Sequence, residues 1–420
     1  MIQRQPHHLL PDPTRVIARP FLPPDEARIQ HIVERVLALQ EEEVERLLQE
    51  VVTQFAHRHR HLARVLQQHC TLVEPYLPRG RQLSEERKLL LGAYFTHEYA
   101  IEAAALFNPS IVLHPEQHGM AAGEARVVIS YRATGEGHIS SVEFRSGTLT
   151  PDGILEYDAV SRFAQLPEIG ADGTLHFPVE IDISERVIFP MAADERNGIE
   201  DVRWVRFVDD DDSVTYYGTY TAYDGSHIKP KLLETKDFIT FRTVPMEGNA
   251  IRNKGFALFP RRIGGQYVML SRQDNENNFI MFSDDIHRWD EAHFLRGPIA
   301  PWELVQIGNN GSPIETEAGW LVLTHGVGPM RQYTLGADLL DLEDPTRLIA
   351  RLDRPLLAPD ETEREGYVPN VVYSCGTLLH NDRLIIPYAM SDSASGVATV
   401  ILPDLLAALS SSPRRICVGR

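Results

Sequence analysis

Hydrophobic positions recur every three or four residues through the first quarter of the chain. Across residues 24–72 these apolar positions alternate with glutamates and arginines, so they fall on one face of an amphipathic helix. Asp25 is placed to cap the first turn. A break rich in proline follows, and Ser84 opens a second helical stretch that runs to about Leu106. The pattern predicts two long helices or a hairpin of helices.

A different pattern begins at Phe107. From there to Pro403, short runs of β-branched and aromatic residues alternate with turns of Gly, Asp, Asn and Pro, and no helical period is found. A strand, a turn with Asp and an apolar or aromatic anchor recur at 280–289, 334–341 and 399–406, and related strands follow His138 and His227, which makes five units. Units of this kind, spaced by roughly fifty to ninety residues, predict the blades of a five-bladed β-propeller. The alternative is a two-sheet sandwich with long loops.

These patterns divide the chain into four segments and predict a mainly β protein. We expect an N-terminal arm at 1–23, a helical extension at 24–106, a propeller at 107–408 and a C-terminal tail at 409–420. We expect the helices to pack on the propeller or to join copies of the chain in a homo-oligomer.

The net charge and the cysteine content exclude some classes of partner and site. The formal net charge of −18 argues against a nucleic-acid partner, because phosphate backbones are bound by surplus lysine and arginine. Cys70, Cys375 and Cys417 lie far apart and suggest neither a disulfide framework nor a zinc site. No secretory signal or run long enough to span a membrane is recognised, so a cytoplasmic location is expected.

No metal or other cofactor is expected. The acidic run at 209–212 lacks the spaced pattern of a calcium loop and sits between two expected strands, which favours a solvated turn. His57 and His61 share a helical face, but the neighbouring arginines would repel a cation.

One segment carries candidate chemistry of its own. Glu200, Asp201 and Arg203 stand at the start of an expected strand, which faces a tyrosine-rich strand that ends at Tyr223. Aromatic faces can stack on sugar rings, and carboxylates can bind hydroxyl groups and move protons. A carbohydrate site is therefore one interpretation, and a solvated turn before a hairpin is the other.

A series of short motifs runs from about residue 107 to residue 406. The segments are 107–110, 131–132, 137–140, 199–203, 220–223, 253–254, 258–260, 308–313, 319–321, 325–327, 336–341, 367–372 and 388–392. Taken together and in this order, they resemble glycoside hydrolase family 130, which contains β-mannoside phosphorylases and β-mannosidases built on a five-bladed propeller.

The resemblance implies roles for several residues. Asp201 matches the aspartate proposed in the phosphorylases as the general acid, which protonates the glycosidic oxygen through the 3-hydroxyl of the sugar. The positions that match those holding the sugar in the −1 subsite are Asn108, Ser110, Arg132 and Asp392.

The phosphate-binding positions are only partly matched. Lys254 and Arg272 fit two basic positions of the phosphorylases, but Glu315 stands where a further lysine is typical. Two like charges about 4 Å apart repel by roughly 4 kcal/mol at an effective dielectric constant near 20, so a glutamate would oppose phosphate. A glutamate could instead activate water in an inverting hydrolase, and the mannosidases of the family show a similar change.

Other residues could complete the site. Glu363 and Glu365 are further candidates for a second carboxylate, with a charged loop as the alternative interpretation. His325, Arg331 and Tyr333 could bind an anion or a hydroxyl group, and together with the two basic positions they would restore a phosphate site.

The leading hypothesis is a glycosidase that hydrolyses a β-mannoside with inversion, with a β-1,2-linked manno-oligosaccharide as the expected substrate. In this hypothesis Asp201 acts on the leaving group, and Glu315, Glu363 or Glu365 activates water. The first alternative is a phosphorylase, a glycosyltransferase that uses inorganic phosphate and releases mannose 1-phosphate. The second is a sugar-binding propeller without catalysis.

Overall fold

The computed structural model describes residues 2–80 and 82–411. Cys417 and all but the first three residues of the expected tail at 409–420 lie outside these ranges. The chain forms two compact units. One, the helical unit, comprises residues 12–101 and 161–165; the other, the β unit, comprises the described parts of 1–11, 102–160 and 166–420. The arm expected at 1–23 is thus divided between the two units.

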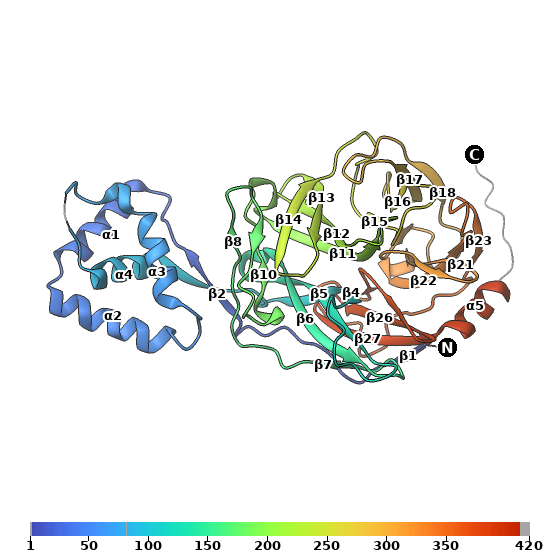
Figure 1. Cartoon of the computed structure of the whole chain (residues 1–420), viewed down its shortest axis with the longest axis horizontal. Coiled ribbons are helices and arrows are strands. Elements are labelled where there is room, and N and C mark those ends of the chain that lie inside the picture. The colour runs from blue at the N-terminus through green and yellow to red at the C-terminus, as the bar shows by residue number, and fades with distance from the viewer. Residues whose placement is uncertain (1, 81, 412–420) are drawn as a thin grey trace. The chain divides into compact units, whose positions relative to one another are not determined.

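The helical unit contains more breaks than the sequence pattern predicted (Figure 1). Asp25 caps the first helix as expected, because its side chain accepts a hydrogen bond from the Ala27 backbone N–H. The expected helix to Leu106 is wrong beyond Tyr94, where the chain turns into a strand that pairs with an N-terminal strand. The elements are β2 (Val16–Pro20), α1 (Glu26–Ala38), α2 (Glu41–Phe55), α3 (Leu62–Thr71), η1 (Glu74–Tyr76), α4 (Glu85–Tyr94) and β3 (Thr96–Ala100).

The helices of this unit share one apolar core, which includes Val33, Val44, Leu91 and Phe95. The Arg87 side chain is buried among them and donates hydrogen bonds to the Val36 and Leu39 carbonyl oxygens at the end of α1. Helix C-terminal carbonyls need such donors, so this arginine closes α1 from another helix.

The β unit is built from successive sets of antiparallel strands, ordered along the chain (Figure 1). The first set contains β4 (Ala105–Leu113), β5 (Ala125–Thr134), β6 (Ser140–Leu149), β7 (Leu155–Tyr157) and β10 (Val187–Ile188). The second contains β8 (Glu168–Ile169), β9 (Leu175–His176), β11 (Gly198–Val208), β12 (Val214–Tyr223), β13 (Ile228–Thr235) and β14 (Thr240–Pro245). One parallel pair, Gly198 with Ser140, joins these two sets.

Three more sets follow in the described part of the chain. The third contains β15 (Ala257–Leu258), β16 (Tyr267–Ser271), β17 (Asn278–Ser283) and β18 (His293–Arg296). The fourth contains β19 (Gln306–Asn309), β20 (Ile314–Thr316), β21 (Gly319–Val327), β22 (Tyr333–Leu340) and β23 (Leu348–Arg351). The fifth contains β24 (Val372–Tyr373), β25 (Leu378–His380), β26 (Arg383–Met390) and β27 (Ala394–Ile401), and it is joined by β1 (Ile2–Arg4).

Short 3₁₀ helices connect some of these strands, and α5 (Leu402–Ser411) follows the last one. The 3₁₀ helices are η2 (Glu136–His138), η3 (Ile183–Glu185), η4 (Ala193–Glu195) and η5 (Pro329–Arg331). None of the described helices is long and apolar enough to cross a membrane.

The hydrophobic core links the sets of strands in a closed order. Separate buried clusters join the first set to the second, the second to the third, the third to the fourth and the fourth to the fifth. A further cluster returns from the fifth set to the first, where Ile385 and Val397 pack with Leu106 and Val127. Each set therefore buries both faces against its neighbours, and no set is left at a free end of the series.

Candidate functional site

Two irregular strands bring together the first residues of the site. β4 and β11 each contain a register shift, between Phe107 and Ser110 and between Glu200 and Arg203. Asn108 and Asp201 lie within these bulges, with positive φ angles of 50° and 55°. The Asn108 Nδ2 atom donates a hydrogen bond of 2.7 Å to Asp201 Oδ1. Bulges redirect side chains out of the alternating pattern, and here they turn both residues toward the same pocket.

Arg132 on β5 holds both carboxylates of the acidic pair. Its Nη2 atom lies 2.9 Å from Glu200 Oε1, and its Nη1 atom lies 3.3 Å from Asp201 Oδ1. Burial raises the pKa of Asp201, but the charges of Arg132 and Lys254 and the hydrogen bond from Asn108 outweigh it, so the net pKa is lowered. Asp201 is therefore ionised at neutral pH.

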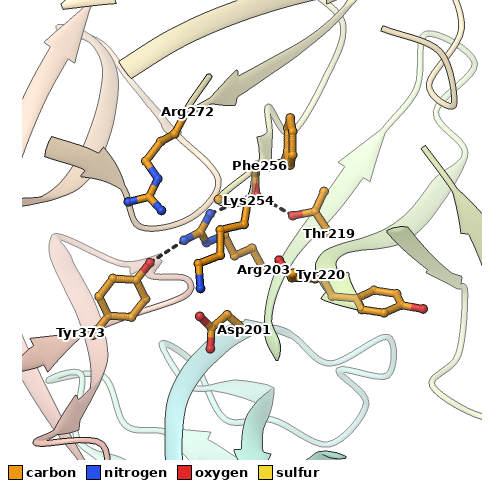
Figure 2. A pocket seen from close by; sticks show the side chains of 10 residues that line it. Asp201, Arg203, Thr219, Tyr220, Lys254, Phe256, Arg272 and Tyr373 are labelled. Atoms are coloured by element: carbon orange, nitrogen blue, oxygen red, sulfur yellow. Dashed lines mark hydrogen bonds between the residues drawn. The ribbon is translucent and has the colours of Figure 1, made fainter. Parts of the chain in front are cut away.

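The Asp201 carboxylate faces a group of cationic side chains. Figure 2 shows Lys254 extending toward Asp201, while Arg203, Arg272 and Tyr373 line the same pocket above it. The adjoining cavity has a volume of about 190 Å³. Its lining comprises Asn108, Arg132, Asp201, Lys254, Arg272, Gln306, His325, Arg331, Tyr333, Val368, Val371, Tyr373 and Asp392.

Gly255 brings two of the arginines together. A Cβ atom at this position, where φ is +91°, would lie 3.0 Å from Arg203 Nη1 and 3.2 Å from Arg272 Nε. These two nitrogen atoms therefore lie within about 6 Å of each other. Two unit charges at that separation repel by about 3 kcal/mol at an effective dielectric constant near 20. Both arginines are buried, and neither pairs with a carboxylate among the described residues. The site thus holds positive charge that an anion would neutralise.

A neutral histidine orients Arg272. His325 is buried, and burial together with Arg272 and Arg203 lowers its pKa well below the usual value. With the proton on Nδ1, His325 donates to Asn310 Oδ1 at 3.1 Å, and its Nε2 accepts from Arg272 Nη1 at 3.3 Å. The Tyr333 ring stacks on the imidazole at an interplanar angle of 16°. Arg272 is therefore oriented without a competing negative charge.

Asp392 is the second aspartate that lines the pocket, and its pKa is shifted in the opposite direction from that of Asp201. It lies in the turn between β26 and β27, with a φ of 53°. Burial and the negative charge of Asp201 raise its pKa to about 6, although Arg132 and Arg331 act in the other direction. The pocket thus contains one carboxylate with a lowered pKa and one with a raised pKa.

Three other predicted binding residues, Ser110, Glu200 and Tyr223, do not line the pocket. Ser110 is buried, and its hydroxyl accepts a hydrogen bond from the Trp204 backbone N–H at 3.0 Å. Glu200 pairs with Arg132 and with Lys254, whose Nζ is 3.5 Å from Glu200 Oε2. Tyr223 donates its hydroxyl to the Gly225 carbonyl oxygen, which is on a turn.

The structure places Glu315 away from this pocket, whereas a role in activating water beside Asp201 would require it to face the pocket. Its carboxylate is 44% exposed and receives two hydrogen bonds from Arg261, at 2.8 and 2.6 Å. It lines a different cavity, together with Trp204 and Pro313. Arg261 lowers the pKa of Glu315, so the carboxylate is a weak base. Glu315 therefore neither opposes an anion beside Lys254 nor activates water there.

Glu363 and Glu365 also lie outside the lining of the Asp201 pocket. The Glu363 side chain is 1% exposed and is paired with Arg4, Nε to Oε1, at 2.8 Å. Glu365 is exposed on a loop. The structure thus does not bring the three glutamates proposed to activate water to the pocket that holds Asp201.

Two polar residues of the pocket, Tyr373 and Gln306, were not predicted from the sequence. Tyr373 accepts a hydrogen bond of 2.6 Å from Arg203 Nη2. It follows the predicted motif at 367–372 by one residue, which could have pointed to it. No comparable signal marks Gln306.

Metal-binding geometry is not found in the described ranges, where no three His, Cys, Asp or Glu side chains are placed to hold an ion. In the acidic turn, Asp209 instead receives a hydrogen bond from Arg262 at 2.6 Å.

Comparison with known proteins identifies the family. The model of glycoside hydrolase family 130, described as beta-1,4-mannooligosaccharide phosphorylase, matches residues 86–410. The chain belongs to this family, as the ordered motifs predicted.

Curated relatives match between 50% and 60% of the chain. A 1,2-beta-oligomannan phosphorylase from Thermoanaerobacter sp. is 37% identical over 219 residues, which span 50% of this chain and 71% of the relative. A beta-1,2-mannobiose phosphorylase from Listeria innocua is 31% identical over 52% of this chain and 62% of its own length. A beta-1,4-mannooligosaccharide phosphorylase from Ruminococcus albus is 31% identical over 60% and 78%.

Solved structures share the fold. The Listeria innocua beta-1,2-mannobiose phosphorylase, determined with beta-1,2-mannobiose, matches 74% of this chain and 93% of its own with a TM-score of 0.56 and 21% identity. A structure from a study of family 130 hydrolases that target beta-1,2 mannosidic linkages in Candida mannan has a TM-score of 0.54 and 20% identity over 72% and 86%. At this identity the likeness concerns the fold alone.

Proposed function

We propose that this protein is an enzyme that cleaves a β-mannoside with inorganic phosphate and releases mannose 1-phosphate. The observation that carries the proposal is the group of cations beside Asp201: Arg203, Lys254 and Arg272, with Arg331 in the same cavity. A dianion would offset their mutual repulsion and accept several charge-assisted hydrogen bonds. The names of the curated relatives, all mannoside phosphorylases, agree with this choice.

The architecture supports the same proposal. We take the five sets of strands as the blades of a propeller, because each packs on the next and the fifth packs on the first. Residues from several blades then meet in one pocket: Asn108 and Arg132 from the first, Asp201 from the second, Arg272 from the third, His325 from the fourth and Asp392 from the fifth. Such a pocket can surround a single sugar ring.

In the proposed reaction, a phosphate oxygen forms a bond to the anomeric carbon of the mannosyl unit while the glycosidic C–O bond breaks. The leaving oxygen takes a proton that originates on Asp201 and passes through the 3-hydroxyl of the sugar. Asp201 must then carry a proton, although its pKa is lowered in the unliganded protein. Phosphate placed against Lys254 would cancel part of the positive charge that lowers this pKa. Proton uptake by Asp201 would thus be tied to phosphate binding.

Hydrolysis was the leading hypothesis from the sequence, and the present findings favour phosphorolysis instead. The hydrolytic interpretation depended on Glu315, which pairs with Arg261 and lines a different cavity. We propose a β-1,2-linked manno-oligosaccharide as substrate, on the strength of the 1,2-linked substrates named for two of the relatives. The proposed cytoplasmic location rests on the few, widely spaced cysteines.

The test is product analysis with and without phosphate. The purified protein is incubated with β-1,2-mannobiose, and with β-1,4-mannobiose in parallel, and sugar phosphates and free mannose are quantified. We expect mannose 1-phosphate from the 1,2-linked substrate only when phosphate is present. If free mannose is released as fast in phosphate-free buffer as in buffer with phosphate, phosphorolysis is rejected in favour of hydrolysis.

A further inference from the structure

The turn that carries Asp392 has an unusual backbone. Ser391 and Asp392 both have positive φ angles, 49° and 53°. Residues other than glycine seldom adopt this conformation, and it persists where surrounding contacts enforce it. The contacts of this turn therefore determine where the Asp392 carboxylate lies in the pocket.

The loop at 360–371 supplies those contacts. The Ser391 hydroxyl donates a hydrogen bond of 2.7 Å to the Glu363 carbonyl oxygen. The Ser391 backbone N–H donates to the Val371 carbonyl oxygen at 2.8 Å, and the Val368 N–H donates to the Ser391 carbonyl oxygen at 3.1 Å. Val368 and Val371 also line the pocket. The loop and the turn are thus bound to each other on the side that faces the site.

Glu363 fixes this loop through its side chain. Its carboxylate accepts a hydrogen bond from the Tyr388 hydroxyl at 2.5 Å and one from the Asp360 backbone N–H at 3.1 Å. Arg4 adds two more, from Nε at 2.8 Å and from Nη2 at 2.9 Å. Arg4 also donates to the Ala358 carbonyl oxygen at 2.7 Å. A buried carboxylate is stable only when it is paired in this way.

We propose that Arg4 and Glu363 are positioning residues for Asp392. Their ion pair holds the loop at 360–371, the loop holds Ser391, and the turn thereby presents the Asp392 carboxylate to the pocket. A strand from the N-terminal end of the chain thus acts on the site without contacting substrate. The inference depends on the proposed function only for the reaction in which Asp392 takes part.

The position of Asp392 sets its titration. The charged groups that act on it are Asp201 on β11, Arg132 on β5, Arg331 in η5 and Lys254 in the segment before β15. Burial is the largest cause of its raised pKa, which is about 6. A loosened turn would admit water to the carboxylate, and the pKa would fall toward the ordinary value of an aspartate, about 3.9.

The experiment measures this pKa directly. The full-length protein is labelled with aspartate carrying ¹³C in the carboxyl group, and the Asp392 signal is assigned by its loss in Asp392→Asn. We expect Glu363→Gln to lower the Asp392 pKa by at least half a unit. Arg4→Gln, which removes the same ion pair from its other partner, should also lower it; this variant decides the question if Glu363→Gln fails to fold.

The matched control is Glu102→Gln, which alters another buried glutamate, 1% exposed and paired with Arg145 at 2.6 Å. It should leave the Asp392 pKa unchanged even if it lowers the melting temperature. An unchanged Asp392 pKa in Glu363→Gln, or in Arg4→Gln if the first variant does not fold, would overturn the inference.

A second measurement separates this inference from the proposed function. The pH profile of kcat/KM for mannose 1-phosphate release should show the same displacement in Glu363→Gln. A wild-type protein that releases no mannose 1-phosphate would defeat the proposed function, and the NMR titration would still decide the role of Arg4 and Glu363.

Discussion

Asn108 and Asp201 face one another from two β-bulges, joined by a hydrogen bond of 2.7 Å between side chains whose residues both have positive φ. They are 93 residues apart and belong to neighbouring sets of strands. Each strand is therefore irregular at the residue whose side chain makes this contact, and the two bulges together bring the side chains within hydrogen-bond distance.

Asp201→Asn should reduce kcat for mannose 1-phosphate release by about 100- to 10,000-fold, the usual contribution of a general acid or base. Substrate binding, measured by calorimetry, should persist because the amide retains the shape of the carboxylate. Asp209→Asn is the control, because this aspartate lies on the acidic turn and pairs with Arg262. Undiminished turnover in Asp201→Asn would remove it from the mechanism.

Arg272→Gln should raise KM for phosphate by about 10- to 100-fold, because charge-assisted hydrogen bonds are worth about 1.5–3 kcal/mol. KM for the mannoside should change much less. Steady-state kinetics with each substrate varied in turn measures both constants, and Arg262→Gln controls for the loss of an arginine away from the pocket. Equal effects on both constants would argue against a dedicated phosphate contact.

Gly255→Ala should also weaken phosphate binding. The new methyl group would lie 3.0 Å from Arg203 Nη1 and 3.2 Å from Arg272 Nε, so it would push the two guanidinium groups from their places. Gly264→Ala is a matched control: it has a positive φ of 59° but no atom within 4 Å of the added carbon. If both variants raise KM for phosphate equally, backbone strain and not contact with the arginines is responsible.

Glu315→Gln should leave phosphorolysis within about twofold of the wild type. It removes an exposed ion pair with Arg261, and such pairs contribute about 0–1 kcal/mol to stability. Turnover with phosphate and the free energy of unfolding in urea measure the two effects. A tenfold or larger loss of turnover would restore Glu315 as a functional residue.

Asp392→Asn should stabilise the protein at neutral pH while it impairs function. The folded state raises the pKa of Asp392 to about 6, so between the unfolded value, about 3.9, and pH 6 the folded protein binds more protons. The wild type therefore loses stability as the pH rises through this window, by up to about 3 kcal/mol.

The asparagine of Asp392→Asn does not titrate, so the variant does not lose stability as the pH rises from 4 to 6. Melting temperatures of both proteins, compared at each pH from 4 to 7.5, should show a gain for the variant at pH 7 that disappears near pH 4. A difference that does not vary with pH would mean that Asp392 titrates normally.

The sequence predicted the mainly β architecture, the helical N-terminal region and the central place of Asp201, since these depend on local periodicity and on motif order. It did not predict the direction of Glu315. That residue lies on the three-residue strand β20, opposite Trp320, and the register of so short a strand is decided by its partner. The strand at Thr96–Ala100 was missed for a similar reason, because its partner, β2, lies 76 to 84 residues earlier in the chain.

Glu363 shows a second limit. Its neighbours in the sequence suggest an exposed charged loop, yet the side chain is buried because Arg4 and Tyr388 reach it from distant strands. Contacts at a sequence separation of 359 residues leave no local pattern. Tyr373 and Gln306 likewise line the pocket together with residues that are distant from them in the sequence.

The pairing of β1 with β27 places a constraint on the order of assembly. Arg4 lies opposite Ala398, so the fifth set of strands is incomplete until both ends of this region exist. At a synthesis rate of about 5–20 residues per second, the N-terminal strand waits roughly 20–80 s for its partner. During that interval β27 lacks its neighbour β1 or is itself unmade, and Glu363, once made, has Arg4 already available. A nascent chain can therefore complete the pairing that positions Arg4 only after β27 has been made.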